Sequence, residues 1–258
     1  MNNRIMIVTD LDGTLLKNDK TVSDYTKQVI KKVQENGDIF AIATARPIRA
    51  AKKFLSELKY DIGIYHNGAV IQEGTKTLGN YGINEPKRIL DLFIQENENI
   101  RIAVECNDVL YSNFDADEFW PGTTFQYTSD FMEIKNLIAD KIIIEVKSLD
   151  DMNKYGKRLP DDLYIQMSEN KIGMIMNKKA TKLDSILYVA RMNKIDVNDI
   201  YVFGDDYNDL DMLSFFKKGI AVSNSLEDVK LKAKYICDSN ENDGVAKWIE
   251  KNILKKGE

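Results

Sequence analysis

The stretch "IMIVTDLDGTLL", residues 5–16, joins an apolar run to two aspartates that stand two positions apart. Its first part, "RIMIVTD", has the continuous apolar character of a strand buried on both faces of a parallel sheet. Charges at the end of such a strand are costly to bury, so the presence of Asp10 and Asp12 there needs an explanation. Gly13 follows, and glycine permits close backbone approach or a positive φ.

Outward from this stretch, apolar runs alternate with helical patterns. A helix is expected after Thr21, which with Asp24 resembles a capping box, and Gly37 supplies its stop. Further strands are expected at "DIFAIATA" (38–45), "DIGIYHNGAVI" (61–71), "DIYVFGDD" (199–206) and "GIAV" (219–222), and further helices after Pro47 and at "TKLDSILYVARM" (181–192), "DLDMLSFF" (209–216) and "SLEDVKLKA" (225–233). This alternation predicts an α/β fold, with a doubly wound, mostly parallel, Rossmann-like sheet and helices on both faces.

The sequence pattern changes in the middle of the chain. "IRIAVECNDVLYSNF" (100–114) and "LYIQMSENKIGMIM" (163–176) resemble hairpins, turning at Asn107-Asp108 and at Glu169-Asn170. A strand at "KIIIEV" (141–146) and helical candidates near 86–97 and 150–158 accompany them. We therefore expect an inserted α+β domain at 82–177, and a discontinuous core domain made of 1–81 and 178–258.

Composition narrows the class of protein. With 258 residues and 43% hydrophobic content, the chain can bury one large core, or a core plus a smaller second domain. The N-terminus lacks the zones of a signal peptide and no window approaches a membrane span, so a cytoplasmic protein without membrane contact is expected. A net charge of -5 argues against nucleic-acid binding. Cys106 and Cys237 lie far apart and are expected to be buried thiols. We expect a monomer or a weak homo-oligomer.

Polar residues collect where the predicted parallel strands end. Asp10 ends the first strand, Thr44 and Arg46 the second, His66 and Asn67 the third, and "GDDYND" (204–209) the strand after the insertion. Each alone reads as a turn or a helix cap. Because ligands of open α/β sheets bind outside the carboxyl ends of the strands, their joint occurrence predicts a site at that edge.

These motifs carry a resemblance. "DLDGT", "TAR", "HNG", a lysine at the head of a helix and "GDDYND", in this order, resemble the haloacid dehalogenase superfamily of phosphatases, and more narrowly its Cof-type members with a large α/β cap. The resemblance covers the whole chain. Family members commonly carry TGR where this chain has Thr44-Ala45-Arg46, which keeps the backbone N–H and adds a methyl group.

The resemblance implies roles for the aspartates. Asp10 is similar to the family's nucleophile, which forms an aspartyl-phosphate, and Asp12 to the acid that protonates the leaving oxygen and then activates water. It implies Mg²⁺ held by Asp10, the backbone carbonyl of Asp12 and Asp205, with Asp209 supporting them. Without a cation, these carboxylates should repel one another or be partly protonated.

A lysine and a phosphate cradle complete the implied site. Lys178, Lys179 and Lys182 crowd together, but Lys182 alone follows Thr181 at a helix start capped with Asp184, which favours it as the lysine that faces phosphate and Asp10. Thr44, the Ala45 N–H and Asn208 would complete the cradle. For Arg46 two interpretations stay open, a substrate contact or a pairing with a carboxylate.

Two further features could be interpreted as functional, but we consider these interpretations weaker than those above. His66 is the only histidine, but the family has no fixed acid–base residue at this position. The aromatic residues of "DEFWPGTTFQY" (117–127) are expected to form the core of the insertion rather than a substrate pocket.

The sequence thus predicts a Mg²⁺-dependent phosphatase of small phosphorylated metabolites, with sugar phosphates the first guess from the resemblance. A phosphomutase and a non-enzymatic sensor of a phosphometabolite are the alternatives. A protein-phosphate hydrolase is disfavoured by the bulky insertion.

Overall fold

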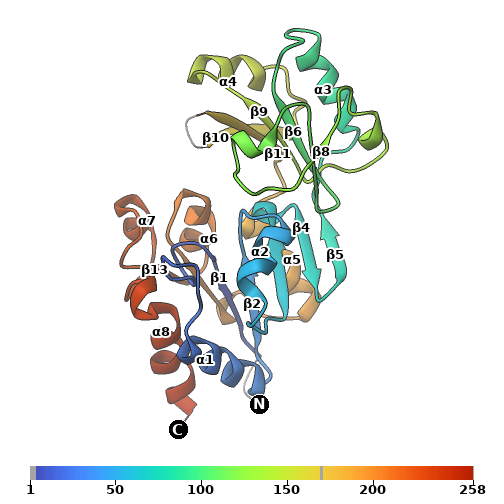
Figure 1. The fold of residues 1–258 in the computed structure, drawn as a ribbon. Helices are drawn as coiled ribbons and strands as arrows, with labels where there is room; N and C mark the ends of the chain where they lie inside the picture. The colour runs from blue at the N-terminus through green and yellow to red at the C-terminus, as the bar shows by residue number, and fades with distance from the viewer. Residues whose placement is uncertain (1–3, 169–170, 258) are drawn as a thin grey trace. The chain divides into compact units, whose positions relative to one another are not determined.

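The chain forms two compact units, which are described separately. The computed structural model describes residues 4–168 and 171–257 (Figure 1). The core unit comprises Met1–Gly79 and Thr181–Glu258, and the inserted unit comprises Asn80–Ala180. The chain therefore leaves the core unit once and returns to it once.

The core unit is built on an eight-stranded sheet of order β14-β13-β12-β1-β2-β3-β4-β5. All neighbouring strands from β14 to β3 are parallel. The strands are β1 (Met6–Thr9), β2 (Ile39–Ala43), β3 (Ile62–Tyr65), β4 (Val70–Glu73), β5 (Lys76–Asn80), β12 (Ile200–Gly204), β13 (Lys218–Val222) and β14 (Tyr235–Cys237). Every residue of β1 and β2 is buried, as their continuous apolar sequence predicts for central strands covered on both faces.

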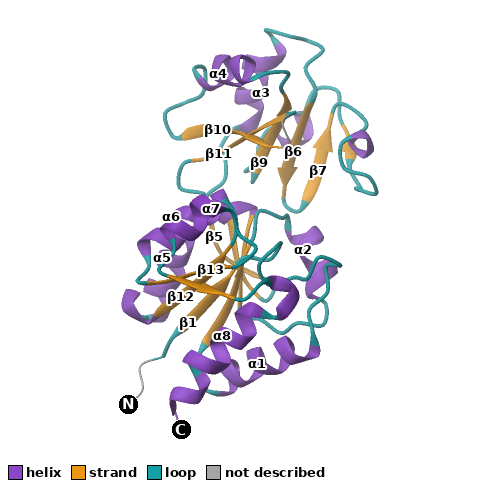
Figure 2. Ribbon diagram, turned by 90° about the vertical axis from the view of Figure 1, so that its left-hand side faces the viewer, coloured by secondary structure: helices purple, strands orange, loops and turns teal. Residues whose placement is uncertain are grey.

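Helices cover both faces of this sheet, as the alternating pattern predicts. They are α1 (Asp24–Glu35), α2 (Ile48–Leu55), α5 (Lys182–Asn193), α6 (Leu210–Phe215), α7 (Glu227–Lys232) and α8 (Gly244–Asn252). Helix α1 packs with α8 on one face, and α5 packs with α6 on the other (Figure 2). The predicted α/β fold is confirmed.

Two local expectations for the core unit are wrong. The run 61–71 is not one strand, because a turn at His66–Gly68 divides it into β3 and β4, which pair antiparallel. The N-cap of α1 is Ser23, whose hydroxyl accepts a hydrogen bond from the Thr26 N–H. Thr21 instead donates its hydroxyl to Asp19 in the preceding turn, so it is not available to the helix.

The inserted unit contains a six-stranded sheet of order β10-β11-β9-β6-β7-β8. Its pairs are antiparallel except β7 with β8. The elements are α3 (Pro86–Ile94), β6 (Ile102–Cys106), β7 (Val109–Ser112), β8 (Gln126–Tyr127), β9 (Lys141–Glu145), α4 (Leu149–Gly156), β10 (Leu163–Ser168) and β11 (Ile172–Asn177). Asn107 and Asp108 both have positive φ, as a tight turn between β6 and β7 requires. The turn expected at Glu169-Asn170 lies outside the described residues.

Each face of this sheet has its own apolar cluster. Phe93 of α3 and Tyr155 of α4 pack on one face. Phe119, Trp120 and Phe125 pack on the other. These three aromatic side chains therefore belong to the core of the insertion, as expected, whereas Tyr127 is 65% exposed.

Candidate active site

The carboxyl ends of three neighbouring strands bring the predicted residues together. Asp10 follows β1, Thr44 follows β2 and Asp205 follows β12, and β1 lies between the other two strands. The Asp10 N–H donates to the carbonyl of Phe203 in β12, at 2.9 Å, so the parallel pairing continues to Asp10. Residues about 190 positions apart in sequence therefore meet at one edge because the sheet order reverses at β1.

The loop after Asp10 is fitted closely against Asp205. Gly13 has a φ of +76°, and a Cβ there would lie 2.4 Å from Oδ2 of Asp205, so any other residue would strain the loop and displace this carboxyl group. The Thr14 hydroxyl donates to Oδ1 of Asp205 at 2.6 Å. The Asn224 side chain donates to the Gly13 carbonyl at 2.7 Å. Thr14 and Asn224 were not singled out from the sequence, although Thr14 belongs to the quoted motif "DLDGT".

Lys182 is the first residue of α5, and the Thr181 side chain caps that helix by accepting from the Asp184 N–H. The Lys182 side chain is only 1% exposed. Its ammonium donates to Oδ1 of Asp10 at 2.5 Å and to Oδ1 of Asp209 at 2.7 Å. A buried cation at a helix N-terminus opposes the helix dipole, and here two carboxylates compensate for it.

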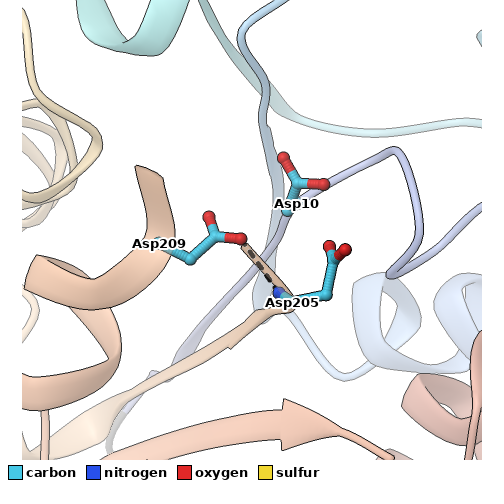
Figure 3. Close-up of side chains that lie close together, drawn as sticks. All are labelled: Asp10, Asp205 and Asp209. Atoms are coloured by element: carbon cyan, nitrogen blue, oxygen red, sulfur yellow. Dashed lines mark hydrogen bonds between the residues drawn. The ribbon is translucent and has the colours of Figure 1, made fainter. Parts of the chain in front are cut away.

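Asp209 organises the loop that carries Asp205. Its Oδ2 accepts from the backbone N–H groups of Asp205 and Asp206, at 2.9 and 3.2 Å, while its Oδ1 accepts from Lys182. A Cβ on Gly204 would lie 2.5 Å from this carboxyl group, so glycine is needed for the approach. Figure 3 shows the carboxyl groups of Asp10, Asp205 and Asp209 directed toward a common space.

The electrostatics of this cluster are those of crowded carboxylates. Burial raises the pKa of Asp10 well above its ordinary value; Lys182 opposes the rise, while Asp209 and Asp205 add to it. Burial also raises the pKa of Asp205, to about 6. Burial would lower the pKa of Lys182, but Asp10 and Asp209 outweigh it and raise that pKa. Burial and the neighbouring carboxylates therefore disfavour the ionised forms of Asp10 and Asp205.

The residues of the cluster fit a divalent cation. One carboxylate oxygen from each of Asp10, Asp205 and Asp209 lies within 4.8 Å of the others. Mg²⁺ binds oxygen at about 2.0–2.1 Å, so oxygens on opposite sides of it are about 4 Å apart. Three carboxylates and the Lys182 ammonium leave two negative charges, which one divalent cation neutralises. Both oxygens of Asp209 already accept hydrogen bonds, which suits a supporting position better than direct coordination.

Asp12 lies in a different environment from Asp10. The Arg46 guanidinium binds it through two hydrogen bonds, and the Lys20 ammonium adds a third at 2.8 Å. Burial favours the neutral acid, but the hydrogen bonds from Arg46 and Lys20 outweigh it and lower the pKa of Asp12. Of the two interpretations open for Arg46, the structure contains the pairing with a carboxylate. Lys20 gave no signal in the sequence, where it is one of several charged residues in a turn.

The remaining predicted residues lie on the β2 and β12 sides of the site. The Thr44 hydroxyl accepts from the Arg46 N–H at 3.1 Å, and its carbonyl accepts from the Asn67 N–H at 2.9 Å. Asn208 donates its side-chain amide to Oδ1 of Asn67 at 3.1 Å. Ala45 is half-buried between Thr44 and Arg46. His66 is buried in the turn after β3, and its backbone N–H donates to the Arg46 carbonyl.

Comparison with known proteins agrees with this geometry. The sequence matches the haloacid dehalogenase-like hydrolase family over residues 7–249, which includes most of both parts of the core unit and the whole insertion. The chain belongs to this family. The resemblance carried by "DLDGT" and "GDDYND" is thereby confirmed.

Relatives of this haloacid dehalogenase-like hydrolase include phosphatases. The chain is 27% identical over 261 residues to the 5-amino-6-(5-phospho-D-ribitylamino)uracil phosphatase YitU of Bacillus subtilis, covering 95% of this chain and 96% of that one. The chain is therefore an enzyme, a phosphatase of this family.

Solved structures share the fold. A protein of Thermotoga maritima superposes with a TM-score of 0.84 at 22% identity, covering 96% of this chain and 97% of that one. A sugar phosphatase of subclass IIB superposes with a TM-score of 0.79 at 22% identity, covering 96% and 98%. In the parts of this hydrolase that the structure describes, no helix is long and apolar enough to cross a membrane.

Proposed function

We propose that this hydrolase is a Mg²⁺-dependent phosphatase of small phosphorylated metabolites, with sugar phosphates the first candidates, and that it acts through an aspartyl-phosphate on Asp10. The observation that carries the proposal is the contact of a buried Asp10 with Lys182, at 2.5 Å, beside Asp205. A structural ion pair would need one carboxylate. Two extra carboxylates at the same point are explained by a cation and by phosphate chemistry.

In the first step, an oxygen of Asp10 attacks phosphorus and the bond from phosphorus to the leaving oxygen breaks. Asp12 gives its proton to that oxygen. In the second step, Asp12 takes a proton from a water molecule, whose oxygen attacks phosphorus and releases inorganic phosphate and Asp10. Lys182 holds Asp10 in place and offers positive charge to the phosphoryl oxygens.

The phosphoryl group would be held by residues of the β2 and β12 ends. We assign this cradle to the Thr44 hydroxyl, the Ala45 N–H, Arg46 and Asn208. Mg²⁺ would be held by Asp10, the backbone carbonyl of Asp12 and Asp205, with Asp209 supporting them, and it would supply charge neutralisation for the phosphoryl group. The fit of the donor set to a divalent cation supports this assignment.

Residues 82–177 are proposed to act as a cap that selects the leaving group, while the core domain of 1–81 and 178–258 binds phosphate. Deleting the cap should reduce the differences in activity among phosphate esters more than it slows hydrolysis of a small activated ester. A folded, cap-free core that kept the parent's ranking would contradict this role.

The direct test is a phosphate-release screen with purified protein, with Mg²⁺ and with a chelator. The panel should hold sugar phosphates and 5-amino-6-(5-phospho-D-ribitylamino)uracil, the compound named for the Bacillus subtilis relative. Asp10→Asn protein is the control for contaminating phosphatases. Release that needs Mg²⁺ and is absent from the Asp10→Asn protein supports the proposal, and equal release by both proteins contradicts it.

Two alternatives have distinct products. A phosphomutase would use the same nucleophile but return the phosphoryl group to a second hydroxyl, so product analysis would find an isomer rather than inorganic phosphate. A sensor would bind the ester without turnover. A sensor needs no nucleophile beside an acid, so the pair Asp10 and Asp12 favours an enzyme.

A further inference from the structure

The loop that follows β13 contacts both partners of the hydrogen bond between Thr14 and Asp205. Asn224 of this loop donates its side-chain amide to the Gly13 carbonyl at 2.7 Å, and the Leu226 N–H donates to the Asp205 carbonyl at 3.1 Å. The Thr14 hydroxyl donates to Oδ1 of Asp205 at 2.6 Å. These three hydrogen bonds close a ring, because Gly13 adjoins Thr14 and the two other donors share one short loop. Asp205 is thus held through both its backbone and its carboxyl group.

The orientation of the Asn224 amide is fixed by Asn240. The Asn240 backbone N–H donates to Oδ1 of Asn224 at 3.0 Å. A backbone N–H can only donate, so Asn224 presents its oxygen to Asn240 and its nitrogen to the Gly13 carbonyl. The Asn224 side chain is exposed, so water competes for each of its hydrogen bonds. The second contact therefore restricts a side chain that a single hydrogen bond would hold loosely.

Asn240 is buried, and it also contacts the far end of the segment 13–18. Its side-chain amide donates to the Leu16 carbonyl at 2.9 Å and to Oδ1 of Asn18 at 3.2 Å. The neighbouring Glu241 accepts from the Asn18 N–H at 2.5 Å. The segment is therefore held at its start by the loop after β13 and at its end by the 3₁₀ turn that contains Asn240.

We propose that Asn224 and Asn240 are positioning residues for Mg²⁺ binding. They fix the segment 13–18, and Thr14 of that segment holds the Asp205 carboxylate in the orientation that binds the cation. The inference rests on the proposed function, in which Asp205 is a metal ligand. Because Thr14 already restricts rotation of this carboxyl group, less ordering remains to be done when the cation binds.

Calorimetric titration of the purified protein with Mg²⁺ alone tests the inference. Asn224→Ala should raise the Mg²⁺ dissociation constant by about three- to tenfold, the factor that one net hydrogen bond represents. Because the Asn224 side chain is exposed and uncharged, the variant should fold and keep the charge of the site. The Mg²⁺ concentration for half-maximal phosphate release should rise by the same factor, a larger change than that in kcat. A melting temperature lowered equally with and without Mg²⁺, at an unchanged dissociation constant, indicates a structural role only and overturns the inference.

The route through Thr14 is tested by a double-mutant cycle. Thr14→Val removes the hydroxyl group that holds Asp205 and should by itself weaken Mg²⁺ binding. If Asn224 acts through Thr14, Asn224→Ala should change the dissociation constant by less than about twofold in the Thr14→Val background. Equal factors in the wild-type and Thr14→Val backgrounds overturn the proposed route.

Asn240→Ala should also weaken Mg²⁺ binding, because it removes the donor to the Leu16 carbonyl. The matched control is Asn242→Ala in the same turn, since the Asn242 side-chain amide donates to Asp238. The dissociation constant of this control should equal that of wild type, and an equal rise in both variants overturns the role of Asn240. Because Asn240 is buried, the exposed Asn224 decides the inference if Asn240→Ala does not fold.

Failure of the inference and failure of the proposed function give different results. Unchanged Mg²⁺ binding in Asn224→Ala, with binding present in wild type, overturns the inference alone. A wild-type protein that binds no Mg²⁺ removes the cation from the proposed function and overturns the inference with it.

Discussion

Each unit of the molecule buries a lysine among carboxylates, and the two clusters differ in where they lie. In the core unit, Lys182 contacts Asp10 and Asp209 at the ends of parallel strands. In the inserted unit, Lys141 of β9 lies opposite Glu105 of β6 within an antiparallel pair, and both are less than 10% exposed.

The comparison teaches that a buried charge does not by itself mark a site. Glu105 and Lys141 face each other along a sheet, where opposite charges on neighbouring strands stabilise the pairing. The core cluster instead converges from separate loops, two of which need glycine for the approach. Convergence of charged side chains from separate loops is therefore the useful signal.

The largest expected effect concerns Asp10. Asp10→Asn should lower kcat by roughly 10,000-fold or more, because an amide cannot serve as the nucleophile. The same change should raise the melting temperature of the metal-free protein, because it removes one of the crowded carboxylates. Phosphate release and thermal unfolding measure the two effects. Activity within tenfold of wild type would exclude Asp10 as the nucleophile.

Asp12→Asn should have the second-largest effect on kcat. Loss of general acid–base assistance should lower kcat on an alkyl phosphate by about 100- to 10,000-fold. Nitrophenyl phosphate should suffer less in the first step, because its leaving group needs no proton. Parallel kinetics on the two esters test this, and equal losses would argue against a proton donor at this position.

Mg²⁺ should stabilise the core cluster and leave the cluster around Lys141 unaffected. At one hundred times its dissociation constant, a bound cation adds about 2.7 kcal/mol to the free energy of unfolding. A chelator should therefore abolish activity and lower the melting temperature, and Ca²⁺ should restore activity poorly because its coordination is looser. Asp205→Asn should lose the thermal shift. A chelator-insensitive enzyme without that shift would remove Mg²⁺ from the mechanism.

Glu105→Gln tests the cluster around Lys141 in the inserted unit. It removes a buried negative charge opposite Lys141 and should cost about 1–3 kcal/mol of stability. Because Glu105 lies in a paired strand of the inserted unit, the folded variant should retain kcat on nitrophenyl phosphate within a few-fold. Urea unfolding measures the loss of stability, and kinetics at low temperature measure kcat of the folded variant. A loss of kcat comparable to that of Asp10→Asn would erase the distinction between the clusters.

The smallest effect is a pH dependence. Burial raises the pKa of Asp205 and of Asp140 to about 6 in the folded chain. A carboxyl group whose pKa is raised by folding binds its proton more tightly in the folded state, so stability without metal should increase as the pH falls from 7 to 5. Mg²⁺ competes with the proton of Asp205 but not with that of Asp140.

Melting temperatures between pH 5 and pH 7 measure this difference, with a chelator and with Mg²⁺. Asp205→Asn should flatten the profile only when metal is absent. Asp140→Asn should flatten it by the same amount in both conditions. If the two variants respond to Mg²⁺ alike, the two acids do not differ in the way proposed.

Much of the fold follows from periodicity. Continuous apolar runs identified the central strands, and the carboxyl-end rule brought Asp10, Thr44 and Asp205 to one edge. The run 61–71 was misread as one strand although the turn residues His66-Asn67-Gly68 interrupt its apolar character, and the chain reverses there into β4. Helix α8 and strand β14 were not predicted at all.

The sequence predicted those candidate-site residues that belong to recognisable motifs. Lys182 could be chosen among three lysines because Thr181 and Asp184 announce a helix start. Lys20 could not be identified from the sequence, because its contact with Asp12 depends on a positive φ that a lysine rarely adopts. Asn224 likewise reaches Gly13 across more than 200 residues, a distance over which spacing carries no information.

The sheet order also constrains how the enzyme is made. Strand β1 is flanked by β2 and by β12, and β12 begins only at Ile200. A ribosome adding about 5–20 residues per second completes the whole insertion before β12 emerges. Until then β1 is an unpaired sheet edge, which is prone to association with other chains. Asp205 and Asp209 also emerge only after Lys182. A chain whose synthesis stops before them holds Asp10 without these partners, and we expect it to be inactive rather than weakly active.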